Sequence, residues 1–463
     1  MCYLRGLCYA KQNAFDRAKE CYKDAVRIDI QCFEAFDQLM KNSLMSPGEE
    51  WEFLETLNFD SVQSEQSAAS EAADFTRNLY ITRLSKYARP EEFNSAIETL
   101  STHYRLDSNP DVLLSKAEIL YASSRYVPAL ALTNQILELD PYNFAAMPLH
   151  LALLHHQNHT TALFALAHDL ADTHPSEPCT WLAVGTYYLS TNRIPEARSY
   201  FSKASLMDPH FGPAWIGFAH TFAAEGEGDQ AIAAYSTAAR LFQGTHLPQL
   251  YLGMQEISLG NLGIAREYLT TAFNLCGTDP LLINEIGVVA YMEEEWDSAV
   301  RHFMLALRIV EDNEAPAHQY TSTRLNLAHA LRRSGRFDEA LTQFEEVIRL
   351  GLREAGVFAS KGLLLLELEQ PFDATVALHE ALAISPQDPM ASDLLAKALT
   401  MLEEDGALGG AEEEAVDLGL REKLAAVRKA KAPRRRRVMQ SHEDDDLGED
   451  MDLDGASDTR RRP

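Results

Sequence analysis

The sequence lacks the signatures of the common enzyme classes. It contains no P-loop, no G-x-S-x-G elbow and no H-E-x-x-H motif. Its six cysteines show no C-x-x-C spacing, so we interpret them as reduced thiols of the cytosol or nucleus. We therefore predict no catalytic residue, no metal site and no cofactor.

Long apolar runs and an excess of basic charge are absent too. No run of roughly 18 apolar residues exists and the first residues do not form a signal peptide, so no membrane span is expected. The chain carries 69 acidic and 41 basic residues, which gives a net charge of −28. This charge disfavours nucleic acid and anionic membranes as partners and favours basic or apolar protein segments.

What the sequence does contain is an internal repeat within residues 178–245. Trp181 and Trp215 lie 34 residues apart, and five further pairs of similar residues share this offset: Gly185 with Ala219, Tyr188 with Phe222, Ala197 with Ala231, Phe201 with Tyr235 and Ala204 with Ala238. Within each copy, apolar residues recur at helical spacing on both sides of a polar break. The pattern W-x2-[LV]-G-x2-Y…A-x3-F-x2-A…P is typical of tetratricopeptide (TPR) repeats. We predict an all-α TPR superhelical solenoid with a disordered charged C-terminal tail.

In each predicted repeat, small residues of one helix face large residues of the other. A glycine inside a helix costs about 1 kcal/mol relative to alanine, so its recurrence indicates close helix packing. The residues predicted to pack the repeats are Trp181, Gly185, Tyr188, Ala197, Phe201, Ala204, Trp215, Ala231, Gly253, Ala265, Gly287, Ala299, Ala340, Gly362 and Ala374.

The repeat frame divides the chain into four parts. Residues 110–388 are predicted to form a regular array of about eight repeats, with one slip of the frame placed in an extended loop at 311–319. Residues 1–104 are predicted to form degenerate helix pairs that begin inside a repeat, which suggests missing upstream sequence. A capping helix is expected at 390–402, and a disordered tail, with a transient helix at 418–431, at 403–463.

Three short motifs have both a functional and a structural interpretation. A basic cluster made of Lys429, Lys431, Arg434, Arg435, Arg436 and Arg437 fits a nuclear localisation signal, or a solvated run neutralised by nearby acids. Ser441 precedes acids, as in sites of acid-directed kinases, but surface serines are common in such tails. His155 and His159 share a helix face, yet no Cys or acidic cluster joins them, so we favour a polar turn over a metal site.

The concave groove of the array is the candidate functional surface. In TPR arrays the first helix of each repeat, helix A, lines this groove, and the second helix of the repeat is helix B. The residues that fall at groove positions between 246 and 354 are Leu250, Tyr251, Met254, Asn284, Glu285, Tyr291, Asn326, His329, Arg332 and Arg333. Their mixture of apolar, amide and cationic groups suits an extended or helical peptide. Alternatively, some of them contact the next turn of the superhelix.

Several stretches carry a family resemblance. The sequences TWLAVGTYYL, FGPAWIGFAHTFAAEGEGDQAIAAYSTAARLFQGTHLPQLYLGMQ, INEIGVVAYMEEEWDSAV and RLNLAHALRR, with QCFEAFDQL near the start, closely resemble the cell-division-cycle-sixteen type TPR subunit of the anaphase-promoting complex (cyclosome). The resemblance covers about residues 1–390. It includes positions that a generic repeat leaves free, at 217–220, 244–248 and 293–296.

The resemblance implies a non-catalytic scaffold in a ubiquitin ligase of mitotic cell-cycle control, present in nucleus and cytoplasm. Partners would be other subunits of the complex and the N-terminal segment of a small stabilising subunit, held in the groove at 246–354. Family members form homodimers through N-terminal repeats. Because the upstream helices of the family are missing here, the resemblance leaves dimerisation of this chain open.

Two other TPR functions are alternatives. A co-chaperone clamp for C-terminal carboxylates needs an Asn at position 9 of helix A, where this chain has Thr186, His220, Met254, Val288, His329 and Leu363. The regulatory TPR arm of a glycosyltransferase needs a downstream catalytic domain, and the charged 60-residue tail is too polar to form one. Both alternatives are therefore disfavoured.

Overall fold

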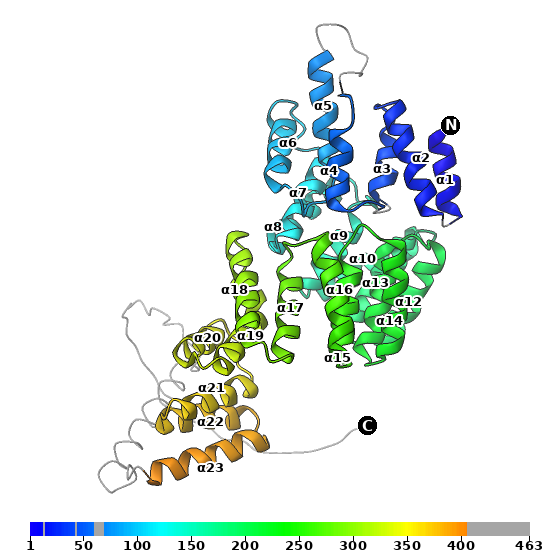
Figure 1. Ribbon diagram of the computed structural model, residues 1–463. Helices are drawn as coiled ribbons and strands as arrows, with labels where there is room; N and C mark the ends of the chain where they lie inside the picture. The colour runs from blue at the N-terminus through cyan, green and yellow to red at the C-terminus, as the bar shows by residue number, and fades with distance from the viewer. Residues whose placement is uncertain (13, 42–43, 60–68, 405–463) are drawn as a thin grey trace, which may run out of the picture. The chain divides into compact units, whose positions relative to one another are not determined.

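The computed structural model describes residues 1–12, 14–41, 44–59 and 69–404. Within these ranges the ordered elements are 23 α-helices and one short 3-10 helix, with no strand (Figure 1). The chain separates into two compact units, residues 1–398 and 399–463, and of the second only the last residues of a helix are described. The predictions for the basic cluster, Ser441 and the tail beyond residue 404 fall outside the described residues.

Most consecutive helices of the first unit pack against each other, and from α5 to α22 every helix contacts the next one. The first six are α1 (Cys2–Lys11), α2 (Phe15–Ile28), α3 (Phe33–Lys41), α4 (Pro47–Glu55), α5 (Ala69–Ile81) and α6 (Pro90–Thr102). Eight A–B pairs follow: α7 (Pro110–Ala122) and α8 (Tyr126–Leu139), α9 (Met147–His156) and α10 (Thr160–Thr173), α11 (Pro178–Ser190) and α12 (Ile194–Met207), α13 (Gly212–Ala224) and α14 (Gly228–Leu241), α15 (Leu247–Ser258) and α16 (Leu262–Leu275), α17 (Pro280–Met292) and α18 (Trp296–Asp312), α19 (Thr321–Arg333) and α20 (Phe337–Arg349), α21 (Ala355–Glu367) and α22 (Pro371–Ile384). Helix α23 (Pro389–Glu404) comes last.

Each turn between the two helices of a pair contains one residue with a positive φ angle at the same place in the repeat. These residues are Ser124, Asn158, Asn192, Gly226, Gly260, Glu294, Gly335 and Glu369. Glycine and asparagine adopt this left-handed conformation at low cost, whereas the two glutamates are strained there. The repeat therefore depends on a fixed turn geometry as well as on packing.

A glycine of helix A contacts a bulky side chain of helix B in five pairs. Gly6 lies under Tyr22, Gly185 under Phe201, Gly253 under Leu269, Gly287 under Phe303 and Gly362 under Leu378. A Cβ atom added to any of these glycines would lie 2.5–2.7 Å from the opposing side chain. Beside each contact of the regular array is a fully buried alanine of helix B: Ala197, Ala265, Ala299 or Ala374. Ala204, Ala231 and Ala340 are fully buried as well.

The two tryptophans tie each repeat to the one before it. The indole Nε1 of Trp181 donates a hydrogen bond to the carbonyl of Pro175 at 3.0 Å, and that of Trp215 to the carbonyl of Pro209 at 2.9 Å. Both rings and Tyr188 are half-buried. Their polar atoms therefore fix the preceding loop, while the glycine contact forms the interior of the pair.

The residues at the slip of the repeat frame are mostly helical, which corrects the extended loop predicted at 311–319. Helix α18 is 17 residues long and continues to Asp312, and the 3-10 helix η2 (Ala317–Tyr320) leads directly into α19. Val310 remains buried in the last turn of α18. The longer helix keeps this apolar contact, so the extra residues lengthen an existing element.

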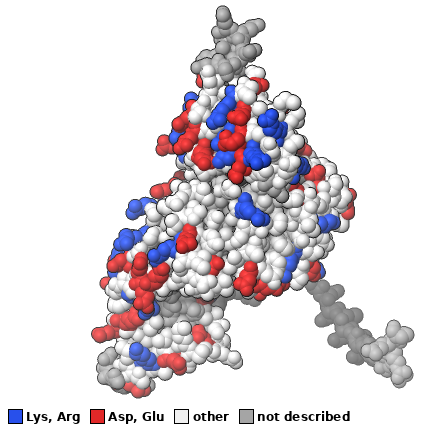
Figure 2. Space-filling model, turned by 45° about the vertical axis from the view of Figure 1, so that its right-hand side comes forward, with Lys and Arg blue, Asp and Glu red and all other residues white. Residues whose placement is uncertain are grey.

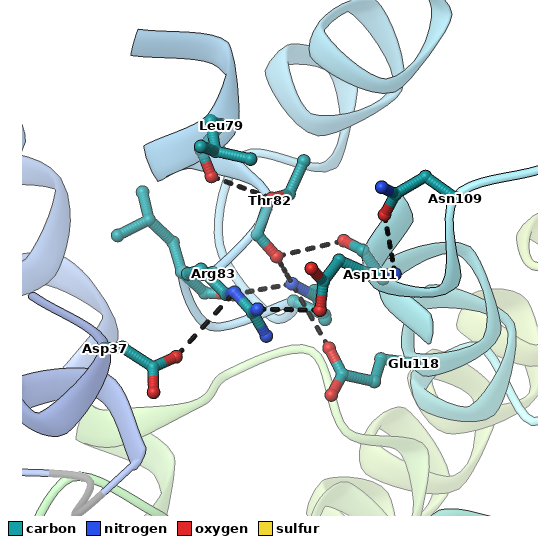
Figure 3. A network of polar contacts seen from close by, with 10 residues as sticks. Asp37, Leu79, Thr82, Arg83, Asn109, Asp111 and Glu118 are labelled. Atoms are coloured by element: carbon teal, nitrogen blue, oxygen red, sulfur yellow. Dashed lines mark hydrogen bonds and ion pairs between the residues drawn. The ribbon is translucent and has the colours of Figure 1, made fainter. Parts of the chain in front are cut away.

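The segment 82–89 between α5 and α6 joins the N-terminal helices to the array (Figure 3). We call this segment and its contacts the joint. The guanidinium group of Arg83 contacts Asp111 of α7 at 2.8 Å and Asp37 of α3 at 3.8 Å. The ammonium group of Lys86 is buried and lies 3.3 Å from Glu118 of α7. These side chains bridge elements that the repeat pattern does not place together.

A buried carboxyl group faces the same segment. Glu50 of α4 is 6% exposed and accepts a hydrogen bond from the backbone N–H of Ser85 at 2.7 Å. Burial raises the pKa of Glu50 to about 7, and the Ser85 hydrogen bond and Lys86 oppose this rise. Glu50 is thus a protonatable contact at the joint.

The glycine contact leads to a direct test. Gly185→Ala places a methyl group 2.7 Å from the Phe201 ring, so we expect a loss of about 1–3 kcal/mol and a lower melting temperature in thermal unfolding. Gly263→Ala, in helix α16, is the matched control because no atom lies within 4 Å of the added Cβ. The control should be neutral or more stable, by up to about 1 kcal/mol. Equal losses in both variants would contradict the packing role.

The buried carboxyl group of Glu50 makes the stability of the folded chain depend on pH. Because the pKa of Glu50 is higher in the folded state than in the unfolded chain, the folded state binds more protons between about pH 4.5 and about pH 7. The stability contributed by Glu50 is full below this window and is lost as the pH rises through it. Glu50→Gln should remove this decline in denaturant unfolding measured across the window. Glu52→Gln, an exposed change on the same helix, should leave the slope unchanged.

Candidate functional site

The predicted groove residues come from the A helices α15, α17 and α19, and we call this surface the A-helix face. Leu250 is fully buried in a cluster with Ala265, Leu269 and Leu282, so it offers a ligand no surface, which corrects its assignment to the groove. Met254 is half-buried against the same cluster. Apolar contact on the A-helix face therefore comes from Met254 in this helix.

Amide and carboxyl groups form a hydrogen-bonded row between α17 and α19. The Asn326 amide Nδ2 donates to Asn284 Oδ1 at 3.2 Å, and Asn284 Nδ2 donates to Glu285 Oε1 at 2.9 Å. Burial raises the pKa of Glu285, and the hydrogen bond from Asn284 opposes this rise. The row is a polar strip across two repeats. Asn284 is buried at its centre (6% exposed), whereas Glu285 and Asn326 are half-buried and can hydrogen-bond a peptide backbone.

Both predicted arginines already have partners in the chain. Arg332 Nη1 lies 2.6 Å from Glu367 Oε1 of the next A helix, and the Arg332 side chain is 15% exposed. The Arg333 guanidinium lies 4.7 Å from the centre of the Trp296 ring. Tyr291 packs edge-on against the same Trp296 ring at 5.0 Å. These groups link neighbouring repeats. Arg332 is paired with a carboxylate, whereas Arg333 is exposed and has only the ring contact.

The remaining predicted residues belong to ring clusters. The His329 ring packs edge-on against Phe344 at 5.3 Å, and burial together with Arg332 lowers the His329 pKa. Tyr251 contacts the rings of His220 at 4.7 Å and Tyr235 at 5.5 Å. Burial raises the pKa of Tyr251 to about 12, so its hydroxyl stays neutral at physiological pH.

Residues outside the repeat frame close the A-helix face, and the 34-residue spacing does not mark them. The Tyr87 ring, from segment 82–89, packs edge-on against His246 at 4.8 Å. His246 Nε2 in turn lies 2.9 Å from Asp279 Oδ2, and His246 is 2% exposed. No periodic signal marks Tyr87, because it lies in a loop whose position depends on the joint.

A second closure joins turns that are 196 residues apart. The hydroxyl groups of Ser124 and Tyr320 lie 2.6 Å from each other, and Arg125 lies 3.4 Å from Glu314. The α7–α8 turn thus contacts η2. Burial raises the pKa of Tyr320 to about 12. These contacts cover part of the A-helix face, so Glu285 and Asn326, the half-buried residues of the polar strip, are the better ligand groups.

The histidines at 155–159 have structural surroundings. His155 Nδ1 lies 2.7 Å from Ser190 Oγ, and the His156 ring stacks on Tyr126 at 4.6 Å. His159 is the N-cap residue of α10. Across the described ranges, no three His, Cys, Asp or Glu side chains come together as a metal site would require. In the same ranges, no helix combines the length and apolar character of a membrane span.

Comparisons with known proteins agree with the helical repeats. Models described as "Tetratricopeptide repeat" match residues 1–31, 279–351 and 325–389. "Anaphase-promoting complex subunit cut9" of Schizosaccharomyces pombe is 48% identical over 399 residues, covering 86% of this chain and 59% of that protein. "Cell division cycle protein 16 homolog" of Homo sapiens is 33% identical over 404 residues, covering 87% and 64%.

A solved structure is similar over most of its length. The structure described as "Crystal structure of APC/C hetero-tetramer Cut9-Hcn1" aligns with a TM-score of 0.77 and 47% identity. The alignment covers 86% of this chain and 75% of that chain. This chain spans about three fifths of the length of the two curated relatives.

The closure at Ser124 and Tyr320 predicts a local effect. Tyr320→Phe removes one hydrogen bond and should destabilise the contact by about 1 kcal/mol. Hydrogen exchange measured by mass spectrometry should become faster in peptides that cover the α7–α8 turn and η2. Tyr142→Phe, at a partly exposed tyrosine, serves as the control and should leave both peptides unchanged. Unchanged exchange in Tyr320→Phe would show that the hydrogen bond does not hold the two turns together.

Proposed function

Because this chain belongs to the family of anaphase-promoting complex subunits that includes Cut9 and CDC16, we propose that it is a scaffold of that complex. It would be a non-catalytic part of a ubiquitin ligase that acts in mitotic cell-cycle control. The observation that carries the proposal is the 47% identity over 75% of the Cut9–Hcn1 chain at a TM-score of 0.77. Similarity of this extent covers the repeat surfaces on which partner subunits would bind.

We infer that the A-helix face holds a segment of a small partner subunit. Cut9 forms a hetero-tetramer with Hcn1, which supports a partner of this kind here. Glu285 and Asn326, the half-buried residues of the polar strip, can hydrogen-bond the backbone of an extended segment. Half-buried Met254 adds an adaptable apolar contact. The assignment of residues 110–388 as the partner-holding array and 1–104 as degenerate repeats belongs to the same proposal.

A carboxylate clamp of the co-chaperone type is disfavoured because only one of the two predicted arginines, Arg333, lacks a carboxylate partner. Such a clamp needs unpaired cations that can bind a C-terminal carboxylate. Arg332 is bound to Glu367 and Arg333 is stacked on Trp296. The A-helix face therefore favours backbone and apolar recognition over capture of a charged terminus.

We infer that the protein acts in the nucleus and cytoplasm, where the complex of its relatives would operate.

The proposal is tested by purifying the tagged full chain from cells and identifying bound proteins by mass spectrometry. We expect other subunits of the ligase and a small subunit to copurify. Glu285→Gln combined with Asn326→Ala should weaken binding of the small subunit about tenfold, because the Asn326 amide is lost and the Glu285 carboxylate acceptor is replaced by an amide, while large subunits remain bound.

The matched control makes the same substitutions on the B helix α16, as Glu267→Gln with Asn274→Ala at two exposed positions. It should retain all partners. Recovery of chaperones without ligase subunits would contradict the scaffold function. Full retention of the small subunit by the Glu285 and Asn326 variant would contradict the A-helix face as its binding surface.

A further inference from the structure

Two adjoining hollows lie between the N-terminal helices and the pair α13–α14. The first has a volume of about 450 Å³ and is lined by α1, α2 and α3 on one side and by α13 and the residues around it on the other. The second has a volume of about 550 Å³ and lies between the start of α2 and the end of α14. Phe15 and His210, whose rings are 5.3 Å apart, lie at their border. We call the two hollows the N-terminal cleft; α1–α3 lie beside α12–α14 in Figure 1.

The rim of the cleft carries unpaired positive charge. Four exposed cations line it: Lys11, Arg17, Lys41 and Arg240. Among the described residues none of the four forms an ion pair, and Arg17 has a ring contact, 5.8 Å from the centre of Tyr9. The acids on the lining are Asp16 and Asp208. Elsewhere both signs of charge lie side by side, as at the top of the view in Figure 2. The cleft is therefore a positive island in a chain whose net charge is −28.

The floor of the cleft is apolar, and two of the lining residues have a buried polar atom without a partner among the described residues. The apolar lining consists of Leu7, Phe211, Ile216 and Phe242. The hydroxyl group of Tyr22 is fully buried and has no hydrogen-bond partner among the described residues, and the same holds for Nε2 of His210. A buried polar atom without a partner costs about 1–3 kcal/mol. Burial raises the pKa of Tyr22 to about 12, so its hydroxyl remains a donor.

We propose that the N-terminal cleft binds a short acidic segment of another polypeptide, with a bulky apolar side chain between its carboxylates. The apolar side chain would cover the floor, and the carboxylates would lie at the four cations. Nucleic acid fits less well, because the floor is apolar and the net charge repels a long polyanion. The cleft is a different surface from the A-helix face, so the proposal does not depend on the partner assigned there.

The test is a binding titration on the full chain, followed by fluorescence anisotropy. The probe is a short fluorescein-labelled synthetic peptide in which glutamates flank leucine and phenylalanine. Lys41→Gln combined with Arg240→Gln should weaken its binding about tenfold, as the loss of two rim charge contacts predicts. Both side chains are exposed, so the fold should be retained. Binding of the probe should also weaken as salt is added.

The matched control is Arg301→Gln with Arg308→Gln, which removes two exposed positive charges from α18, outside the cleft. This variant should bind the peptide as the unmodified chain does. If both variants lost peptide binding equally, the loss would reflect the net charge of the chain, and the proposal would be overturned. Two other results would also overturn it: binding unchanged in the cleft variant, or a peptide with lysines in place of glutamates that binds equally well. Displacement of the probe by single-stranded DNA at equal concentration would assign the cleft to nucleic acid instead.

Discussion

The contact between a helix-A glycine and a bulky helix-B side chain is the constraint on which the rest of the array depends. It is seen at Gly185 under Phe201 and again at Gly287 under Phe303. Phe201 also lies against Gly217 of the following repeat, so one ring packs within its own pair and against the next. A side chain larger than hydrogen at these positions would separate the helices. The separation would then change the angle at which every later pair packs, because each repeat contacts mainly its neighbours.

Packing within the helix pairs does not by itself fix the arrangement of residues 1–398. Residues outside the repeat frame also join helices that are far apart in the sequence. Arg83 and Lys86 connect α3 and α7 through carboxylates, and Tyr87 reaches the His246–Asp279 pair. These charges are partly or fully buried, where an ion pair stabilises the fold only if its geometry and hydrogen bonds offset desolvation. The buried charges of the joint thus cost some stability but fix the N-terminal helices relative to the array. Because Glu50 can be protonated there, this arrangement depends on pH.

The candidate surfaces differ in how their charges are used. On the A-helix face Arg332 is paired with Glu367 and Arg333 is stacked on Trp296. The other groups open to a ligand are the Asn326 amide, a carboxyl group of raised pKa and a methionine. In the N-terminal cleft the cations have no acidic partner among the described residues. The first surface suits a neutral stretch of peptide and the second an acidic one. Two such surfaces on one chain fit a scaffold that holds several partners at once.

The sequence by itself determined the local features, because they repeat with the helix period and the 34-residue unit. The all-α TPR fold, the family, and the close packing at Gly185, Gly253, Gly287 and Gly362 could all be predicted from spacing or from resemblance. Spacing could not show that Leu250 is buried or that Arg332 is paired, since both depend on the neighbouring repeat. Only the tertiary structure decided that the turn at Ser124 meets Tyr320. That contact depends on small rotations added over many repeats, and a short sequence pattern does not record their sum.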